Sequence, residues 1–194
     1  MKKFLYIMIF VLLFLTACSS EATIEPVEMK GDIYAEINKK LDQGAGEGEY
    51  FFKVNNLGKD ESLKIDLVSY DGSKETKIID GMPKKINGFY IRMEKDKYIF
   101  AEIEDFKSAK IGETSTYKSE ENFSDKESNM SISRHLEEKT SLSKPVIVFQ
   151  KDFAKADTVV HNNYGLDDSK IDLKNQFGYA VIVTKVEDKD GGNN

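Results

Sequence analysis

Two histidines are the side chains in this chain best suited to acid–base chemistry. His135 follows a Ser- and Glu-rich stretch, and His161 precedes three closely spaced carboxylates, Asp167, Asp168 and Asp172. An imidazole within hydrogen-bond reach of a carboxylate could act as a general base, so one hypothesis is a small envelope hydrolase or isomerase that uses His161 or His135. Neither the histidines nor the aspartates have the spacing of a zinc or calcium site. We therefore predict no metal site and no cofactor.

Ser141-Leu142-Ser143-Lys144 matches the Ser-x-x-Lys motif of penicillin-recognising enzymes by its letters. In those enzymes the motif opens a long helix and has two companions, Ser-Asp-Asn and Lys-Thr-Gly, which are missing from this sequence. A Gly-x-Ser-x-Gly nucleophile motif is missing as well. We therefore predict no catalytic residue from these patterns.

Cys18 is the residue whose surroundings specify a modification most clearly. Lys2 and Lys3 precede an apolar run of 14 residues that ends at Ala17, which is the pattern of a signal peptide. At 1.5 Å per residue this run is shorter than the roughly 30 Å hydrocarbon core of a membrane. Leu15-Thr16-Ala17-Cys18 resembles the lipobox of bacterial lipoproteins. The resemblance implies cleavage after Ala17 and a diacylglyceryl anchor on the Cys18 sulfur.

The predicted anchor places the mature chain at the extracytoplasmic face of the cell membrane. Because Cys18 is the only cysteine, the exported chain would have no disulfide and no cysteine nucleophile. Lys2 and Lys3 leave with the signal peptide, so 28 basic residues become 26 against 34 acidic ones, a formal charge of −8. Affinity for a phosphate backbone needs clustered Lys and Arg, so we expect no nucleic-acid partner.

The residues after Cys18 divide into a tether and a helix. Residues 18–30 are polar, contain Pro26 and have no sustained period, which predicts a flexible tether. In residues 31–43 the apolar side chains fall four apart, as one face of a helix requires, and Asp32 could cap the start.

From Glu49 onward apolar and polar residues alternate, which predicts half-buried strands. Asp71-Gly72 is a strong hairpin signal, and a second hairpin is predicted over residues 89–103, at the centre of the core. The β-branched runs 145–150 and 178–186 predict central strands.

Two stretches lack this alternation. Residues 107–144 are polar and form either an excursion from the domain or, over 125–139, a weak helix. Residues 156–176 are typical of a loop, and 188–194 of a disordered tail.

These elements predict one mainly β domain over residues 31–187, an antiparallel sandwich or barrel-like fold with a short N-terminal helix. Tyr90 and Tyr98 are predicted on or near its polar faces. Aromatic residues outside the core pattern are enriched at binding surfaces, so Tyr117, Phe123 and Tyr164 are the candidate contact residues.

The favoured hypothesis is a membrane-anchored surface lipoprotein whose domain binds an envelope protein or a small ligand without catalysis. Its contacts would come from the 107–144 excursion and the 156–176 loop, because loops on a rigid scaffold often carry recognition. The hydrolase or isomerase described above is the alternative.

Overall fold

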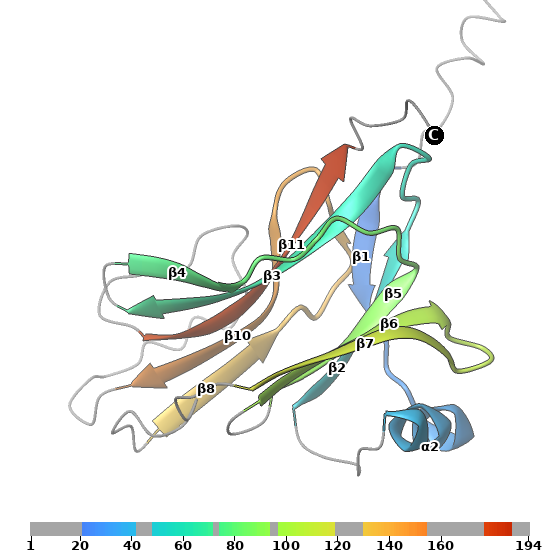
Figure 1. Ribbon diagram of the computed structural model, residues 1–194, viewed down its shortest axis with the longest axis horizontal. Coiled ribbons are helices and arrows are strands. Elements are labelled where there is room, and N and C mark those ends of the chain that lie inside the picture. The colour runs from blue at the N-terminus through green and yellow to red at the C-terminus, as the bar shows by residue number, and fades with distance from the viewer. Residues whose placement is uncertain are drawn as a thin grey trace, which may run out of the picture.

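The computed structural model (Figure 1) shows two antiparallel sheets that face each other, with one short helix against the outer side of one sheet. This confirms the predicted mainly β sandwich with an N-terminal helix. The structure describes residues 21–41, 48–71, 74–93, 97–118, 130–154 and 177–187. None of the helical segments within these ranges has the length and apolarity that crossing a bilayer requires.

Six strands form the first sheet, sheet A, and every neighbouring pair in it is antiparallel. The predicted hairpin over residues 89–103 is present as β5 and β6, in which Ile91 pairs with Phe100. In spatial order the strands are β7 (Lys110–Lys118), β6 (Lys97–Asp105), β5 (Gly88–Met93), β2 (Glu49–Asn55), β1 (Thr23–Pro26) and β9 (Thr140–Ser141).

Five strands form the second sheet, sheet B, which is also antiparallel throughout. Its β3 and β4 confirm the hairpin predicted at Asp71-Gly72, because Asp71 pairs with Lys74. In spatial order the strands are β4 (Lys74–Ile79), β3 (Glu61–Asp71), β11 (Phe177–Glu187), β10 (Val146–Ala154) and β8 (Met130–His135).

The main core fills the space between the sheets. Alternate residues of each strand point into it, as the period of two requires. Phe89, Ile91 and Met93 of β5 and Val181 and Val183 of β11 are all buried in this cluster. The prediction that the β5–β6 hairpin contributes to the centre of the core is confirmed.

The opposite face of sheet A is covered by α2 (Gly31–Lys40). Ile37 and Leu41 of this segment pack on Phe51 and Ile99. The helix begins after Lys30, which makes no side-chain cap, so the prediction of Asp32 as the cap is wrong. Asp32 lies in the first turn instead, where a carboxylate interacts favourably with the helix dipole.

The helix also corrects the prediction for two tyrosines. Tyr90 is 0% exposed and belongs to the cluster beneath α2, and Tyr98 is 4% exposed within the main core. A sheet covered on both faces buries residues that point to either side of it. The alternation of apolar and polar residues alone therefore could not show that Tyr90 is buried.

The predicted tether over residues 18–30 is wrong in part, because Thr23–Pro26 is a strand between β2 and β9. Ala22 and Ile24 are 3% and 0% exposed. The strand has only four residues and ends at a proline, so it is too short to show a period.

The predicted excursion over 107–144 is wrong where the structure describes it, since β7, β8 and β9 lie there. The helix considered for 125–139 is also wrong, because residues 130–135 are strand β8, paired with β10. Pairing along a partner strand outweighs the weak helical spacing of this segment. The predicted loop over 156–176 and tail over 188–194 lie outside the described residues.

Candidate functional site

A groove with a volume of about 390 Å³ lies between the two sheets, on the side where β6 and β7 face β3 and β4. We call it the interlayer groove. Its walls come from alternate residues of facing strands: Leu63, Ile65 and Leu67 of β3, and Glu113 and Tyr117 with Ser115 between them on β7. The period of two that builds the core therefore also lines the groove.

The interlayer groove presents large apolar side chains to solvent beside its charged ones. Met82 is 81% exposed and Tyr117 is 36% exposed, and these are the exposed large hydrophobic residues of the described chain. Both line this groove. Tyr117 was a predicted contact residue, whereas Met82 was missed because it lies in the irregular connection between β4 and β5.

The Met82 segment is held close to β3. The Gly81 amide donates a hydrogen bond to Asp66 Oδ1 at 2.9 Å. A Cβ atom at Gly81 would lie 2.0 Å from the Ile65 carbonyl oxygen, so this approach requires glycine. Further along, Lys84 and Leu63 exchange two backbone hydrogen bonds of 2.8 Å. Met82 is therefore presented by a segment fixed on both sides.

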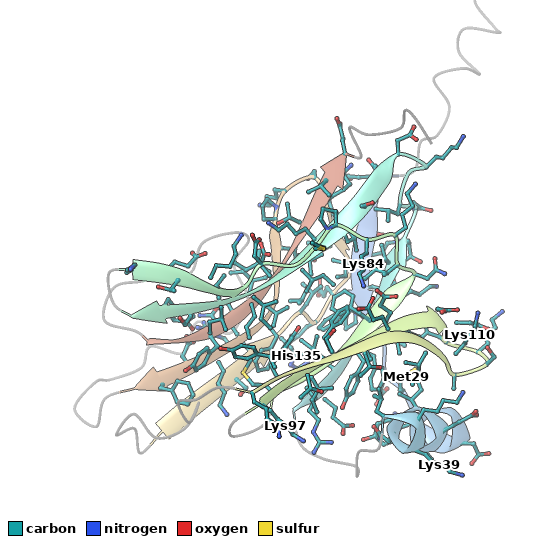
Figure 2. The ribbon with its side chains drawn as sticks, in the orientation of Figure 1. Met29, Lys39, Lys84, Lys97, Lys110 and His135 are labelled. Carbon is teal, nitrogen blue, oxygen red and sulfur yellow. The ribbon has the colours of Figure 1, made fainter. Side chains whose placement is uncertain are left out.

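Charged groups at the groove are paired with one another. Lys84 Nζ donates to Glu113 and, at 3.0 Å, to Glu102, and these two carboxylates in that order raise the pKa of Lys84. The Lys84 side chain is 38% exposed, and Figure 2 marks its position. Lys64 and then Lys77 lower the pKa of Asp80. The groove is therefore suited to an uncharged, apolar group.

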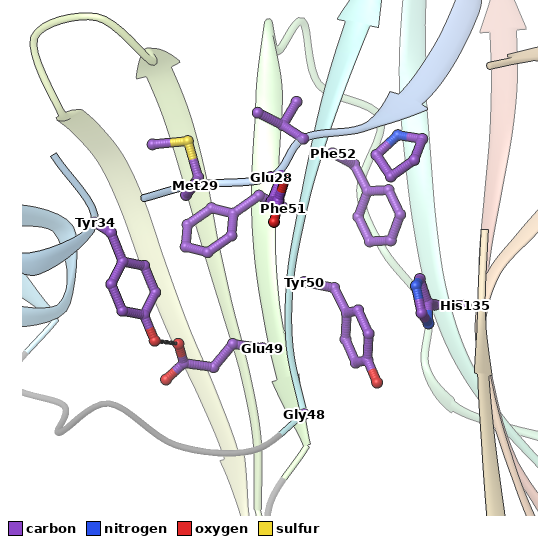
Figure 3. A pocket seen from close by; sticks show the side chains of 11 residues that line it. Glu28, Met29, Tyr34, Gly48, Glu49, Tyr50, Phe51, Phe52 and His135 are labelled. Atoms are coloured by element: carbon purple, nitrogen blue, oxygen red, sulfur yellow. Dashed lines mark hydrogen bonds between the residues drawn. The ribbon is translucent and has the colours of Figure 1, made fainter. Parts of the chain in front are cut away.

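His135 lines a second pocket, of about 400 Å³, together with β2, residues 26–29 and Tyr34 of α2. Its ring lies against that of Tyr50, with centroids 4.8 Å apart, and Tyr50 also contacts Phe149 at 5.1 Å. Burial raises the pKa of Tyr50. Figure 3 shows His135 facing Tyr50 on the side of β2 turned toward sheet B.

Two carboxylates line this second pocket: Glu28, which is largely exposed and ion-paired with Lys30, and Glu49, which lies on the other side of β2 from His135 (Figure 3). The Glu49 side chain is 4% exposed; it accepts hydrogen bonds from the Tyr34 hydroxyl and, at 2.8 Å, from Arg92 Nη1. The bond to Glu49, followed by burial, raises the pKa of Tyr34. Successive residues of a strand point to opposite faces, so Glu49 and the Tyr50–His135 pair are separated by the sheet.

Among the described residues, no hydrogen bond or ion pair joins His135 to a carboxylate. The same residues contain no group of three or more His, Cys, Asp or Glu side chains that could hold a metal ion. Ser141 lies in strand β9 instead of a helix, and its hydroxyl contacts Glu21 and Ser143. The remaining predicted residues fall outside the described ranges: Cys18, Phe123, His161, Tyr164, Asp167, Asp168 and Asp172.

The fold and the groove define an antiparallel β sandwich with a groove between its layers that exposes Met82 and Tyr117. No protein-family model, curated protein or solved structure matches this chain.

Proposed function

We propose that this chain is a lipoprotein anchored at the extracytoplasmic face of the cell membrane through a diacylglyceryl group on Cys18. Its sandwich binds an envelope protein or a small ligand through the interlayer groove and performs no chemistry. The sequence Leu15-Thr16-Ala17-Cys18 supports the anchor. Met82 and Tyr117 support the binding role, because both expose apolar surface at one groove.

The positions of strand ends agree with a recognition role for one end of the sandwich. Asp71 pairs with Phe177, and Met130 pairs with Ala154, so the connections that hold Tyr164 and Phe123 leave sheet B at the same end. Figure 1 shows these strand ends together at the left of the molecule. The last residues of β7, which include Tyr117, run toward this end as well.

The groove is tested by placing a photo-crosslinking benzoylphenylalanine at residue 117 of the lipidated protein in its host membranes. We expect a covalent adduct from residue 117 and none from residue 114, a matched position on the same strand. Thr114 is exposed but pairs with Ala101, whose side chain lies on the face under α2. Once the bound species is identified by mass spectrometry, Tyr117→Ala should weaken its binding by about 10- to 30-fold. Equal adducts from both positions would exclude the groove as the contact site.

The anchor is tested with the Cys18→Ala chain. We expect the natural chain to incorporate labelled fatty acid and to enter the detergent-rich phase on Triton X-114 partition. The Cys18→Ala chain should incorporate no label and should retain its signal peptide, because the lipoprotein peptidase acts on the modified cysteine. Equal labelling of the two chains would contradict the proposal.

The alternative, a hydrolase or isomerase that uses His135 or His161, stays a prediction. His135 and Glu49 line one pocket, but β2 separates their side chains. A His135→Gln substitution that abolished an envelope activity while leaving adducts at residue 117 unchanged would favour this alternative.

A further inference from the structure

The sandwich holds the chain from Glu21 onward. The Ser141 hydroxyl donates to the Glu21 carboxylate, and Asn56 Nδ2 donates to the Glu21 carbonyl oxygen at 3.4 Å. The next residue, Ala22, is 3% exposed, and its carbonyl oxygen accepts a 2.8 Å hydrogen bond from the Leu142 amide. Glu21 is therefore tied to the end of the sandwich that carries the β2–β3 turn and residues 141–145.

Only Ser19 and Ser20 separate Glu21 from Cys18. Three residue steps span at most about 10–11 Å when fully extended. A flexible tether reaching to residue 30 would allow a root-mean-square separation of roughly 20 Å and a maximum near 40 Å. Because β1 is part of sheet A, the domain cannot reach these larger separations from Cys18.

We propose that the sandwich stands directly on the lipid headgroups, on the end formed by Glu21, the turn at residues 56–60 and residues 142–145. This inference rests on the proposed anchor at Cys18 and specifies the surface that meets the bilayer. Strand β3 has 11 residues and runs away from this end, from Glu61 to Asp71. At about 3.3 Å per residue it holds the opposite end roughly 35 Å above the headgroups. The strand ends that lead to Phe123 and Tyr164 therefore face away from the membrane.

The orientation of the sandwich on the membrane, which we call its seating, can be measured because the natural chain has a single cysteine. A lipidated Cys18 has no free thiol, so an introduced cysteine is the only site for a thiol-reactive fluorophore. Lys59→Cys labels the turn at the proposed membrane end, and Lys74→Cys labels the far end of the sandwich. Both lysines are exposed, so the two variants lose the same charge from similar surroundings.

The lipidated variants are reconstituted in phosphatidylglycerol and phosphatidylethanolamine vesicles that contain a nitroxide-headgroup lipid. We expect the label at residue 59 to be quenched at least about threefold more strongly than the label at residue 74, because the two positions differ in height by about 30 Å. A 20-residue Gly/Ser spacer inserted between Ser20 and Glu21 should abolish this difference.

The outcomes separate the seating from the anchor. If the protein stays out of the vesicles and Cys18 reacts with thiol reagents, the anchor is wrong and the seating fails with it. If the protein is lipidated and bound but both labels are quenched equally, the sandwich lies on its side or moves freely, and the seating alone is overturned. A difference that survives the spacer overturns the inference that the two-residue connection fixes this orientation, because the sandwich would then meet the headgroups without it.

Discussion

Gly178→Ala is expected to lower the free energy of unfolding by about 3 kcal/mol or more. Gly178 of β11 lies between Tyr70 of β3 and Asp152 of β10. A Cβ atom there would lie 2.1 Å from the Lys151 carbonyl oxygen and 2.7 Å from the Tyr70 hydroxyl oxygen. The first of these is backbone in the strand ladder, so a change of side-chain rotamer cannot relieve the contact.

The Tyr70 hydroxyl cannot move away without a further loss. It donates to the Asp152 carboxylate and accepts a 3.1 Å hydrogen bond from Gln150 Nε2. Arg134 also donates to Asp152, which is 5% exposed. Displacing the ring would leave buried polar groups without partners, and this adds to the steric cost.

Urea unfolding of the soluble Cys18→Ala chain lacking residues 1–17 measures this effect. Gly112→Ala on the edge strand β7 is the matched control, because its added Cβ would mainly meet Glu102 and Glu104 side chains that can swing aside. We expect that control to stay within about 1 kcal/mol of the parent. A loss of less than 1 kcal/mol for Gly178→Ala would show that the close packing of Tyr70 over β11 is not rigid.

The second large effect is a steep loss of stability in alkali. Burial raises the pKa values of Tyr70, Tyr90 and Tyr98; the Asp152 carboxylate adds to the shift of Tyr70, and Glu49 adds to that of Tyr90. The folded protein therefore keeps these three protons above pH 10, where tyrosines of the unfolded chain release theirs. The unfolded state is then favoured as the pH rises, because it binds fewer protons than the folded state.

Each of the three tyrosines should lower the free energy of unfolding by about 1.4 kcal/mol per pH unit above pH 10, or about 4 kcal/mol per unit together. Their stabilising effect is fully present below pH 10 and is lost as the pH rises toward their folded-state values. A domain with about 5 kcal/mol of stability would therefore unfold near pH 11.

Urea titrations at intervals from pH 9 to pH 11 measure the slope. Tyr98→Phe should reduce this slope by about 1.4 kcal/mol per pH unit. Tyr117→Phe is the matched control, because it removes one hydroxyl from an exposed tyrosine that pairs with Tyr98 on the neighbouring strand. A flat profile across this range would contradict the assignment of the three tyrosines as buried protonated groups.

Local patterns were sufficient for much of the fold. The alternation in β3, β5 and β11 and the four-residue spacing in α2 each record which side of the element is buried. The hairpin of β3 and β4 followed from Asp71-Gly72, since turn chemistry acts over a few residues. Tyr117 was identified because an aromatic in a polar stretch departs from the core pattern.

The errors arose where burial depends on a distant partner. Strand β1 has too few residues to show a period, and it is a strand because β2 and β9 supply its hydrogen bonds. Strand β8 is fixed by β10, and Tyr90 is buried because α2 covers the outer face of sheet A. In each case the deciding contact involves residues remote in sequence, so local propensity carries no record of it.

By itself, the sequence determined the class of fold, its two hairpins, its helix and the prediction of a lipid anchor at Cys18, because each is encoded over a short stretch. Only the tertiary structure brought Met82 and Tyr117 to one groove and placed Glu49 and His135 on opposite sides of β2. It also showed that residues 23–26 of the predicted tether are strand β1, because β2 and β9 both pair with them. These outcomes depend on which strands lie beside and across from one another, and that is settled by packing between elements far apart in the chain.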